Sequence, residues 1–289
     1  LGEEIHIREY LEEKGNTVWE TDLGEFILQL KKDRPMHILS PAIHVPREKV
    51  AEIFTDFFEK EIEPDIAKEV AVVREFMREK YFTADVGMSS ANVVAADTGA
   101  FVIIENEGNV RLCTAAPPIH IIIVGTEKLV PTFQDAMKVT EVTWRYAQYP
   151  VPAYVNIITG PSKTGDIEKV TTYGAHGPKE FYVIFVDNGR SDMEADDDFK
   201  QASHCLRCGG CMYECPVFQI TAGTFGETYL GGIGTIWNVF TSGGLEATSP
   251  QLYTCLRCGR CVERCPMQID VPNMILELRK RLAAGEVIE

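Results

Sequence analysis

Two copies of one cysteine motif in the last third of the chain constrain its fold more than any other feature. Each copy reads Cys-x2-Cys-x2-Cys-x3-Cys-Pro, and both contain Cys-Leu-Arg-Cys-Gly. The eight cysteines are Cys205, Cys208, Cys211, Cys215, Cys255, Cys258, Cys261 and Cys265. Bacterial ferredoxins bind [4Fe–4S] clusters with this spacing, whereas structural zinc sites use four ligands in two separated pairs. The spacing therefore predicts iron–sulfur clusters rather than zinc.

The last cysteine of each motif has a distinct place in the expected ligand sets. In two-cluster ferredoxins it binds the cluster of the other motif. We therefore expect two [4Fe–4S] clusters that lie side by side and form a short electron relay. The ligands expected for one cluster are Cys205, Cys208, Cys211 and Cys265. The ligands expected for the other are Cys215, Cys255, Cys258 and Cys261.

A long glycine-rich segment, residues 216–254, connects the two motifs. Compact bacterial ferredoxins use a shorter connection, and the longer one resembles the helical ferredoxin modules of succinate dehydrogenases and heterodisulfide reductases. We therefore expect a mainly helical module. Positive charge near a cluster raises its potential and can dock an acidic partner, although a solvated helix face is the simpler explanation here. The arginines concerned are Arg207, Arg257, Arg260 and Arg264.

Charge and composition indicate which partners and which cellular compartment this chain can have. The formal net charge is −15, which repels nucleic acids and anionic membrane surfaces. No apolar run approaches the roughly 20 residues of a membrane helix, and no signal peptide is visible at the start. Disulfide scaffolds spread their cysteines through short secreted chains, but here only Cys113 lies outside the two motifs. We expect a cytoplasmic protein without a transmembrane segment, in which Cys113 is a small buried residue between strands.

The first two thirds of the chain predict an α/β domain. Helical spacing favours helices over 3–14, 46–60, 64–81 and 131–148, with Val70, Val73 and Met77 on one face of the third. Short β-branched or aromatic runs predict strands at 101–105, 119–124, 154–158 and 181–186, mostly buried on both faces. Residues 106–109 are expected to form a turn between strands. The acidic run 192–198 is either a linker or the first turn of a helix leading to Cys205, and a final helix is expected over 272–285.

Residues 84–191 resemble the LUD (lactate utilisation) domain. Several short stretches carry the likeness, including Asp97-Thr98-Gly99, Asn106-Glu107-Gly108-Asn109 and Val186-Asp187-Asn188-Gly189-Arg190-Ser191. The other matching stretches are 84–87, 124–132, 158–161 and 177–181. The cysteine region continues the likeness through 215–218 and 231–234. The chain is therefore similar to the LUD-domain iron–sulfur proteins of the flavin-independent L-lactate oxidation complex.

This resemblance implies a fold and a set of partners. The fold would be similar to that of ribose-phosphate isomerases and CoA transferases. The partners would be a cysteine-rich subunit with paired CCG motifs and a second, smaller LUD protein, which together form a hetero-oligomer that oxidises lactate to pyruvate. We expect a LUD domain at 1–191, lacking part of the family's N-terminal segment, and a ferredoxin-like domain at 192–289. Family members usually have Glu where this chain has Asp97.

Three residues are candidates for a pocket in the LUD domain: Asp97, Glu127 and Lys128. Asp97 lies in a turn at a strand end, and Glu127 and Lys128 follow the strand that ends at Val124. Ligands of open α/β sheets bind near such strand ends. Turn chemistry and a surface ion pair would explain the same residues. His120 lies in an apolar strand and is expected to be a core histidine, while His204 is either exposed or bonded to a cluster sulfur.

Three functions remain open from sequence. The first is electron transfer in an oxidoreductase complex for lactate or a related hydroxy acid. The second is electron transfer in a heterodisulfide-reductase-like complex, with the LUD domain as a docking scaffold. The third is a CoA or sugar-phosphate binding module with redox-sensing clusters. No dinucleotide fingerprint or P-loop is visible, so we expect a two-electron acceptor to come from a partner or from a cofactor that leaves no visible motif in the sequence.

Overall fold

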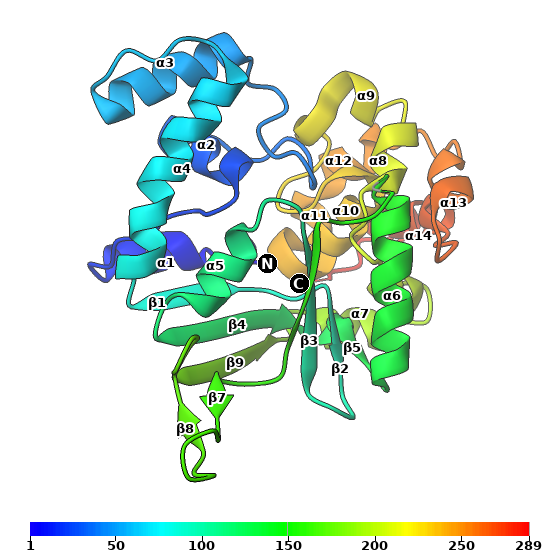
Figure 1. The fold of residues 1–289 in the computed structure, drawn as a ribbon. Coiled ribbons are helices and arrows are strands. Elements are labelled where there is room, and N and C mark those ends of the chain that lie inside the picture. The colour runs from blue at the N-terminus through cyan, green and yellow to red at the C-terminus, as the bar shows by residue number, and fades with distance from the viewer. Residues whose placement is uncertain (149, 289) are drawn as a thin grey trace.

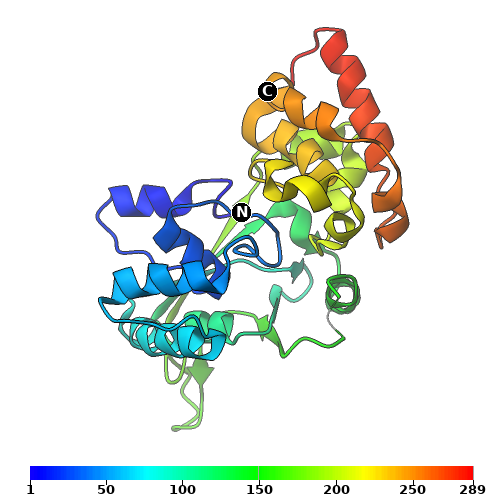
Figure 2. The ribbon, with the colours of Figure 1, turned by 90° about the horizontal axis from the view of Figure 1, so that it is seen from above.

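The computed structural model describes residues 1–148 and 150–288. An α/β region formed by residues up to about 190 adjoins a helical region that contains both cysteine motifs (Figure 1). Seen from above, the helical region lies beside the N-terminal helices, and the start of the chain lies between them (Figure 2). The expected boundary between 191 and 192 falls inside α7 (Arg190–Ala195) and stays a prediction. Residue 289, the expected end of the second domain, lies outside the described residues.

Four helices form the N-terminal layer: α1 (Ile7–Glu13), α2 (Leu23–Lys31), α3 (Arg47–Phe58) and α4 (Ile66–Thr83). Asp22 caps α2 by accepting a hydrogen bond from the Glu25 backbone N–H, which satisfies one of the unpaired donors of the first turn. The predicted helices 3–14, 46–60 and 64–81 are confirmed in position, and α2 was missed. Val73 and Met77 are buried as expected, but Val70 is 41% exposed, so the predicted face of α4 was wrong there.

An aromatic cluster joins three of these helices, α2, α3 and α4. Phe26 and Phe54 are fully buried, and Trp19, Phe57 and Phe76 pack around them with ring centroids 5.1–6.3 Å apart. Edge-to-face geometry dominates, which is the arrangement that aromatic quadrupoles favour. This cluster holds α2, α3 and α4 against one another.

Two sheets form the centre of the α/β region. The parallel sheet has the order β1 (Val86–Ser89), β4 (Ile119–Gly125), β9 (Glu180–Val186). The mixed sheet has the order β5 (Leu129–Val130), β2 (Val93–Ala95), β3 (Ala100–Glu105), β6 (Tyr154–Ile158). Buried apolar side chains from both sheets meet in one core. A small hairpin of β7 (Lys163–Thr164) and β8 (Thr172–Tyr173) projects from the body (Figure 1).

The prediction that the strands are buried on both faces holds for β3 and β4 but was wrong for β6 and β9. In β9, Tyr182, Val183, Ile184 and Phe185 are 37–51% exposed. Both strands lie at the edge of their sheets. An apolar run has the same composition whether a strand is central or at an edge, so the pattern could not separate the two cases.

Helix α5 (Asn109–Ala115) was not predicted, and it shows that the turn expected between two strands was wrong. Residues 106–109 form a turn between β3 and this helix, not between strands, with Gly108 in the left-handed conformation at the helix start. Cys113 therefore lies in a helix, and it is buried as expected. Gly87 in β1 lets α5 approach, because a Cβ there would lie 1.9 Å from the Cys113 carbonyl oxygen. Helix α6 (Phe133–Tyr146), predicted over 131–148, is confirmed and is capped by Thr132.

The helical region packs short helices around Trp237, which is fully buried. After α7 come α8 (Gly210–Glu214), α9 (Phe218–Thr221), α10 (Gly231–Asn238), α11 (Gly244–Ala247), α12 (Ser249–Thr254), α13 (Arg260–Arg264) and α14 (Val271–Ala283). Short 3₁₀ segments lie at Thr126–Lys128, Lys200–His204 and Ala222–Thr224, and a π-helical turn at Val239–Gly243. The predicted final helix is thus confirmed as α14.

The acidic run 192–198 was expected to be either a linker or the first turn of a helix leading to Cys205. In the structure it is partly helical and partly a connecting segment. Its first half belongs to α7, and Asp196 and Asp198 then accept hydrogen bonds from Arg281 of α14 at 2.5–3.1 Å. This cluster ties the entrance of the helical region to its last helix.

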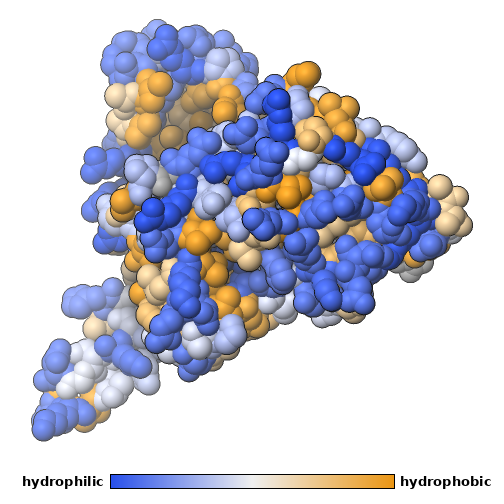
Figure 3. Space-filling model, turned by 90° about the vertical axis from the view of Figure 1, so that its right-hand side faces the viewer, coloured by the Kyte–Doolittle hydropathy of each residue, from blue (hydrophilic) through white to orange (hydrophobic). Residues whose placement is uncertain are grey.

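Hydrophilic residues cover most of the face seen in Figure 3, and hydrophobic residues lie in separate small areas. None of the helices in the described part of the chain combines the length and apolar character needed to cross a membrane.

Candidate iron–sulfur centres and an adjoining pocket

The structure gathers the eight motif cysteines around two neighbouring cavities. Cys261 and the four cysteines predicted for one cluster line the first cavity: Cys205, Cys208, Cys211 and Cys265. Cys211 and the four predicted for the other line the second: Cys215, Cys255, Cys258 and Cys261. Cys211 and Cys261 line both, so the two cavities share a wall. The remaining lining is largely apolar.

The repeated sequence produces a repeated backbone. Arg207 and Arg257 both adopt left-handed conformations, with φ of 59° and 56°, although non-glycine residues rarely do so. Gly209 and Gly259, with φ of 71° and 85°, then begin α8 and α13, which pack against each other. The chain thus curls twice in the same way, and each loop turns its first three cysteines toward a cavity.

The donor set fits a cluster rather than a single ion. In residues 1–148 and 150–288, no group of three or more His, Cys, Asp or Glu side chains is placed to hold one metal ion. Eight thiols instead surround two cavities, as a multi-atom iron–sulfur core requires. Burial raises the pKa of Cys208, Cys211 and Cys255, and that of Cys261 to about 12. Metal binding would have to displace these protons, which is usual for thiolate ligands.

A third cavity, of about 460 Å³, lies between the α/β region and the cysteine region. The carboxyl ends of the parallel strands meet there, as expected for ligand sites in open α/β sheets. Its wall includes Ser89 at the end of β1, Lys128 after β4 and Arg190 after β9. Four residues line both this pocket and the first cysteine cavity: Ile38, Arg207, Tyr229 and Leu230.

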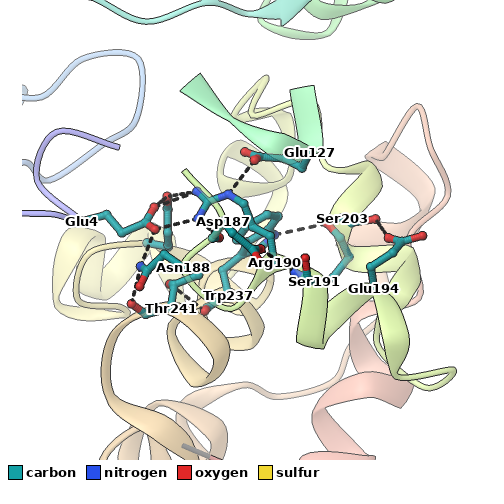
Figure 4. Close-up of polar contacts among 12 residues, drawn as sticks. Glu4, Glu127, Asp187, Asn188, Arg190, Ser191, Glu194, Ser203, Trp237 and Thr241 are labelled. Atoms are coloured by element: carbon teal, nitrogen blue, oxygen red, sulfur yellow. Dashed lines mark hydrogen bonds and ion pairs between the residues drawn. The ribbon is translucent and has the colours of Figure 1, made fainter. Parts of the chain in front are cut away.

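Arg190 is the centre of a buried ion network beside this pocket (Figure 4). Its guanidinium donates to Glu127 at 2.6 Å and to both carboxylate oxygens of Glu4 at 2.7 and 2.8 Å. All three side chains are at most 5% exposed. Burial opposes ionisation of Glu4, but hydrogen bonds from Arg190, Tyr229 and Asn188 outweigh it and lower its pKa. The network joins the N-terminal segment, the end of β4 and the helical region.

Gly189 lets the helical region come close to this network. A Cβ at Gly189 would lie 2.0 Å from the Phe240 carbonyl oxygen, and the residue has a φ of +80°. Both the contact and the conformation exclude other residues. The stretch Asn188-Gly189-Arg190, which contributed to the family resemblance, therefore builds the contact between the two regions.

Two cations in the pocket, Lys128 and Arg207, have no carboxylate at hydrogen-bond or ion-pair distance among the described residues. In the described part of the chain, the Lys128 ammonium makes no hydrogen bond or ion pair, and burial, with the nearby charge of Arg207, lowers its pKa to about 8. The Arg207 guanidinium stacks 3.9 Å from the ring centroids of both Tyr229 and Trp237. Its Nη2 is buried without a hydrogen-bond partner among the described residues.

The three candidate pocket residues are placed differently. Glu127 and Lys128 line the pocket, but Glu127 is paired with Arg190. Asp97 is exposed in the turn after β2, where it accepts a hydrogen bond from the Phe133 backbone N–H and so supports the start of α6. Asp97 does not line the pocket. Sequence reasoning missed Ser89 and Tyr229, and it treated Arg207 as part of a solvated helix face.

Two of the other three motif arginines also differ from that expectation. Arg264 donates to the Tyr146 carbonyl at 3.2 Å, and Arg257 donates to the Pro272 carbonyl at 2.9 Å. Arg260 is exposed, which fits the solvated face. His204 is exposed as well.

His120 is a fully buried core histidine, as predicted. Its Nε2 lies 2.8 Å from Ser89 Oγ, while Nδ1 is buried without a partner in the described residues. Burial lowers the pKa of His120 to about 4, so the ring is neutral near pH 7.

The Cys113 thiol donates to the Met88 carbonyl at 3.1 Å. Burial raises the pKa of this thiol to about 11, so Cys113 is an unreactive thiol.

An α/β domain joined to a cysteine-rich helical module is the class of protein that this geometry defines. Residues 5–186 match the LUD domain model, and residues 201–269 match the model described as a 4Fe-4S dicluster domain. The first match spans more than half of the 289 residues, so the chain belongs to the LUD domain family. The resemblance and the fold class inferred from the sequence are confirmed, and the cysteine region is an iron–sulfur domain.

Curated relatives match most of this chain. Lactate utilization protein B of Anoxybacillus flavithermus is 36% identical over 247 residues, covering 83% of this chain and 50% of the relative. That of Bacillus velezensis is 34% identical over 287 residues, covering 98% and 58%. An uncharacterized electron transport protein, YkgF, of Escherichia coli is 34% identical over 236 residues, covering 81% and 48%. The chain thus spans about half the length of the curated relatives it matches.

Among solved structures, a DUF162 family protein from Deinococcus radiodurans is 18% identical, with a TM-score of 0.25. The match covers 37% of this chain and 57% of that protein. A likeness of this size supports no argument about fold or function.

Proposed function

We propose that this chain transfers electrons through two [4Fe–4S] clusters within an assembly that oxidises lactate or a related hydroxy acid. The observation that carries the proposal is the pair of cysteine-lined cavities with Cys211 and Cys261 on their common wall. Clusters held there would be neighbours, and neighbouring clusters pass electrons efficiently. The names of the relatives, which refer to lactate utilization and electron transport, support the wider role.

The proposed ligand sets are crossed between the motifs. Cys205, Cys208, Cys211 and Cys265 would hold the first cluster. Cys215, Cys255, Cys258 and Cys261 would hold the second. The last cysteine of each motif lines the cavity formed by the other motif, which supports the ferredoxin pattern. The clusters would supply one-electron redox chemistry, and the apolar walls would limit the access of water to them.

Partners are part of the proposal. Oxidation of a hydroxy acid to an oxo acid releases two electrons and two protons, whereas each cluster accepts one electron at a time. A partner should therefore take part in the two-electron step. We propose the CCG-motif subunit and the second, smaller LUD protein for this role, in a cytoplasmic hetero-oligomer.

Reconstitution tests this function. The cluster-loaded chain alone should not reduce an artificial electron acceptor with lactate, and addition of the CCG subunit and the second LUD protein should start turnover. Anaerobic purification of the native assembly would identify those subunits. Fast lactate oxidation by the single chain would contradict the proposed division of labour. Co-purification with flavin or hydrogenase subunits would favour the heterodisulfide-reductase-like alternative.

A further inference from the structure

The pocket between the two regions has the position and size of a small-molecule site. It lies where the carboxyl ends of β1, β4 and β9 meet, and ligands of open α/β sheets bind at such ends. Its volume of about 460 Å³ lies within the range of small-molecule pockets. Side chains from both regions of the chain form its wall.

The charges in the pocket favour a small anion. Arg190 pairs with Glu4 and Glu127 at hydrogen-bond distance, so these three groups together carry one negative charge. Lys128 and Arg207 have no such partner among the described residues. Two further acids line the pocket, Glu3 and Glu25, but burial raises the pKa of both, that of Glu25 to about 8. Near pH 7, Glu25 is therefore mostly protonated and does not neutralise the two cations.

Arg207 has a geometry suited to an oxyanion. The rings of Tyr229 and Trp237 hold its guanidinium plane, and its Nη2 is buried without a partner among the described residues. A planar guanidinium binds carboxylates with two parallel hydrogen bonds, and a buried N–H without an acceptor costs free energy until a ligand supplies one. The Lys128 ammonium adds a second positive charge on the same pocket wall.

Arg207 also places such a ligand beside the first cluster site. It lies between Cys205 and Cys208 in the sequence, and it lines both the pocket and the first cysteine cavity. Tyr229, Leu230 and Ile38 are the other shared wall residues. Single side chains therefore separate the two spaces at these points.

From these observations we propose that the pocket binds the carboxylate of a short 2-hydroxy or 2-oxo acid between Lys128 and Arg207, next to the first cluster. The inference rests on the proposed function and names the binding site for its substrate class. Ser89 and Ser90 also line the pocket and offer hydroxyl groups to the rest of the ligand. Asp97 has no part in this site, and Glu127 acts by holding Arg190.

Pyruvate binding to the anaerobically prepared, cluster-loaded full protein tests this site by calorimetry. We expect the variants Lys128→Met and Arg207→Gln each to weaken binding by roughly 10- to 100-fold, the effect of losing one charged hydrogen bond. Pyruvamide, which lacks the carboxylate, should not bind measurably. The matched controls are Arg257→Gln, the equivalent arginine of the second motif, and Lys138→Met, an exposed lysine. Both controls should bind pyruvate as the unaltered protein does.

Spectroscopy locates the bound acid. In samples reduced by about one electron per chain, so that the clusters do not couple, pyruvate should shift the electron paramagnetic resonance signal of one cluster and leave that of the other unchanged. Absence of pyruvate and lactate binding to protein with intact clusters would overturn the inference, as would unweakened binding by both pocket variants. Equally tight binding of inorganic phosphate at Lys128 and Arg207 would overturn the carboxylate assignment. Iron and sulfide content, measured on the same samples, tests the clusters separately, so failure of the pocket and failure of the proposed function are distinguishable.

Discussion

The two cysteine cavities come from the same motif but have different surroundings. The first lies against the LUD domain: Ile38 lines it, and Arg264 beside it donates to the Tyr146 carbonyl. The second is enclosed by the cysteine module itself, where Arg279 of α14 donates to the Cys255 carbonyl at 2.7 Å. Cys258 at the second cavity is the exposed motif cysteine, whereas the other seven are partly buried.

Because of this difference, the two ends of the proposed electron relay face different parts of the molecule: one faces the LUD domain and the other faces the surface. The first cavity adjoins the pocket of the LUD domain, so under the proposed function it would be the side that meets the substrate. The second has a cysteine at the surface, so under the same proposal it would be the side that meets a partner protein. One repeated motif thus provides two unequal positions because the elements packed around each copy differ.

The largest expected effect comes from breaking the crossed ligand sets. Cys215→Ser should remove mainly the second cluster, so that iron falls from about eight to about four atoms per chain. The first cluster should keep its signal in electron paramagnetic resonance. Cys113→Ser is the matched control, because Cys113 lies in α5 and lines neither cavity, and it should leave the iron content unchanged. Selective loss of the first cluster would show that Cys215 binds with its sequence neighbours.

Arg190→Met should have the next largest effect, because it leaves Glu4 and Glu127 buried without their cation. Breaking one partner of a buried ion network costs about 3–5 kcal/mol of unfolding free energy. Urea unfolding under anaerobic conditions measures it. The control Arg145→Met removes an exposed ion pair with Glu141 and should cost less than about 0.5 kcal/mol. Equal losses in both variants would mean that the network does not hold the two regions together.

Much of the cysteine region could be predicted because ligand spacing is a local property of the sequence. The eight cysteines, the helical character of their module and its last helix followed from the pattern. Arg207 was misjudged, because only packing against Tyr229 and Trp237 distinguishes it from a solvated arginine such as Arg260.

The LUD domain was predicted in outline. Its main strands and three of its N-terminal helices were expected, but the seven-residue helix α5 was not, because it is too short to show a clear period. Lys128 was singled out from its place after a strand. Its place beside Arg207 depends on the contact between two regions that are distant in the sequence, which no local pattern encodes.

A smaller effect should follow from the exposure of Cys258. Brief exposure to air should destroy the second cluster before the first, because oxygen and water reach an exposed ligand more easily. The time course of the two cluster signals, followed by electron paramagnetic resonance on reduced samples, measures the order of loss. Simultaneous loss, or earlier loss of the first cluster, would show that the exposure of Cys258 does not make the second cluster more accessible to oxygen.

The smallest expected effect is a pH dependence from the pocket beside the first cavity. Burial, with the charges of Glu3, Glu20 and Asp22, raises the pKa of Glu25 to about 8 from 4.5. Between these values the unfolded chain loses a proton that the folded chain keeps, so this residue lowers stability as pH rises. Glu25→Gln should therefore stabilise the protein more at about pH 8.5 than at about pH 5, as measured by urea unfolding. Parallel pH curves for the two proteins would show that Glu25 is solvated.

The most direct test of the central claim is the metal content of anaerobically purified protein, combined with electron paramagnetic resonance after full reduction. The account predicts about eight irons and eight acid-labile sulfides per chain. It also predicts a signal broadened by interaction between two neighbouring reduced [4Fe–4S] clusters. Stoichiometric zinc in place of iron, or a single cluster with an unbroadened signal, would contradict the account.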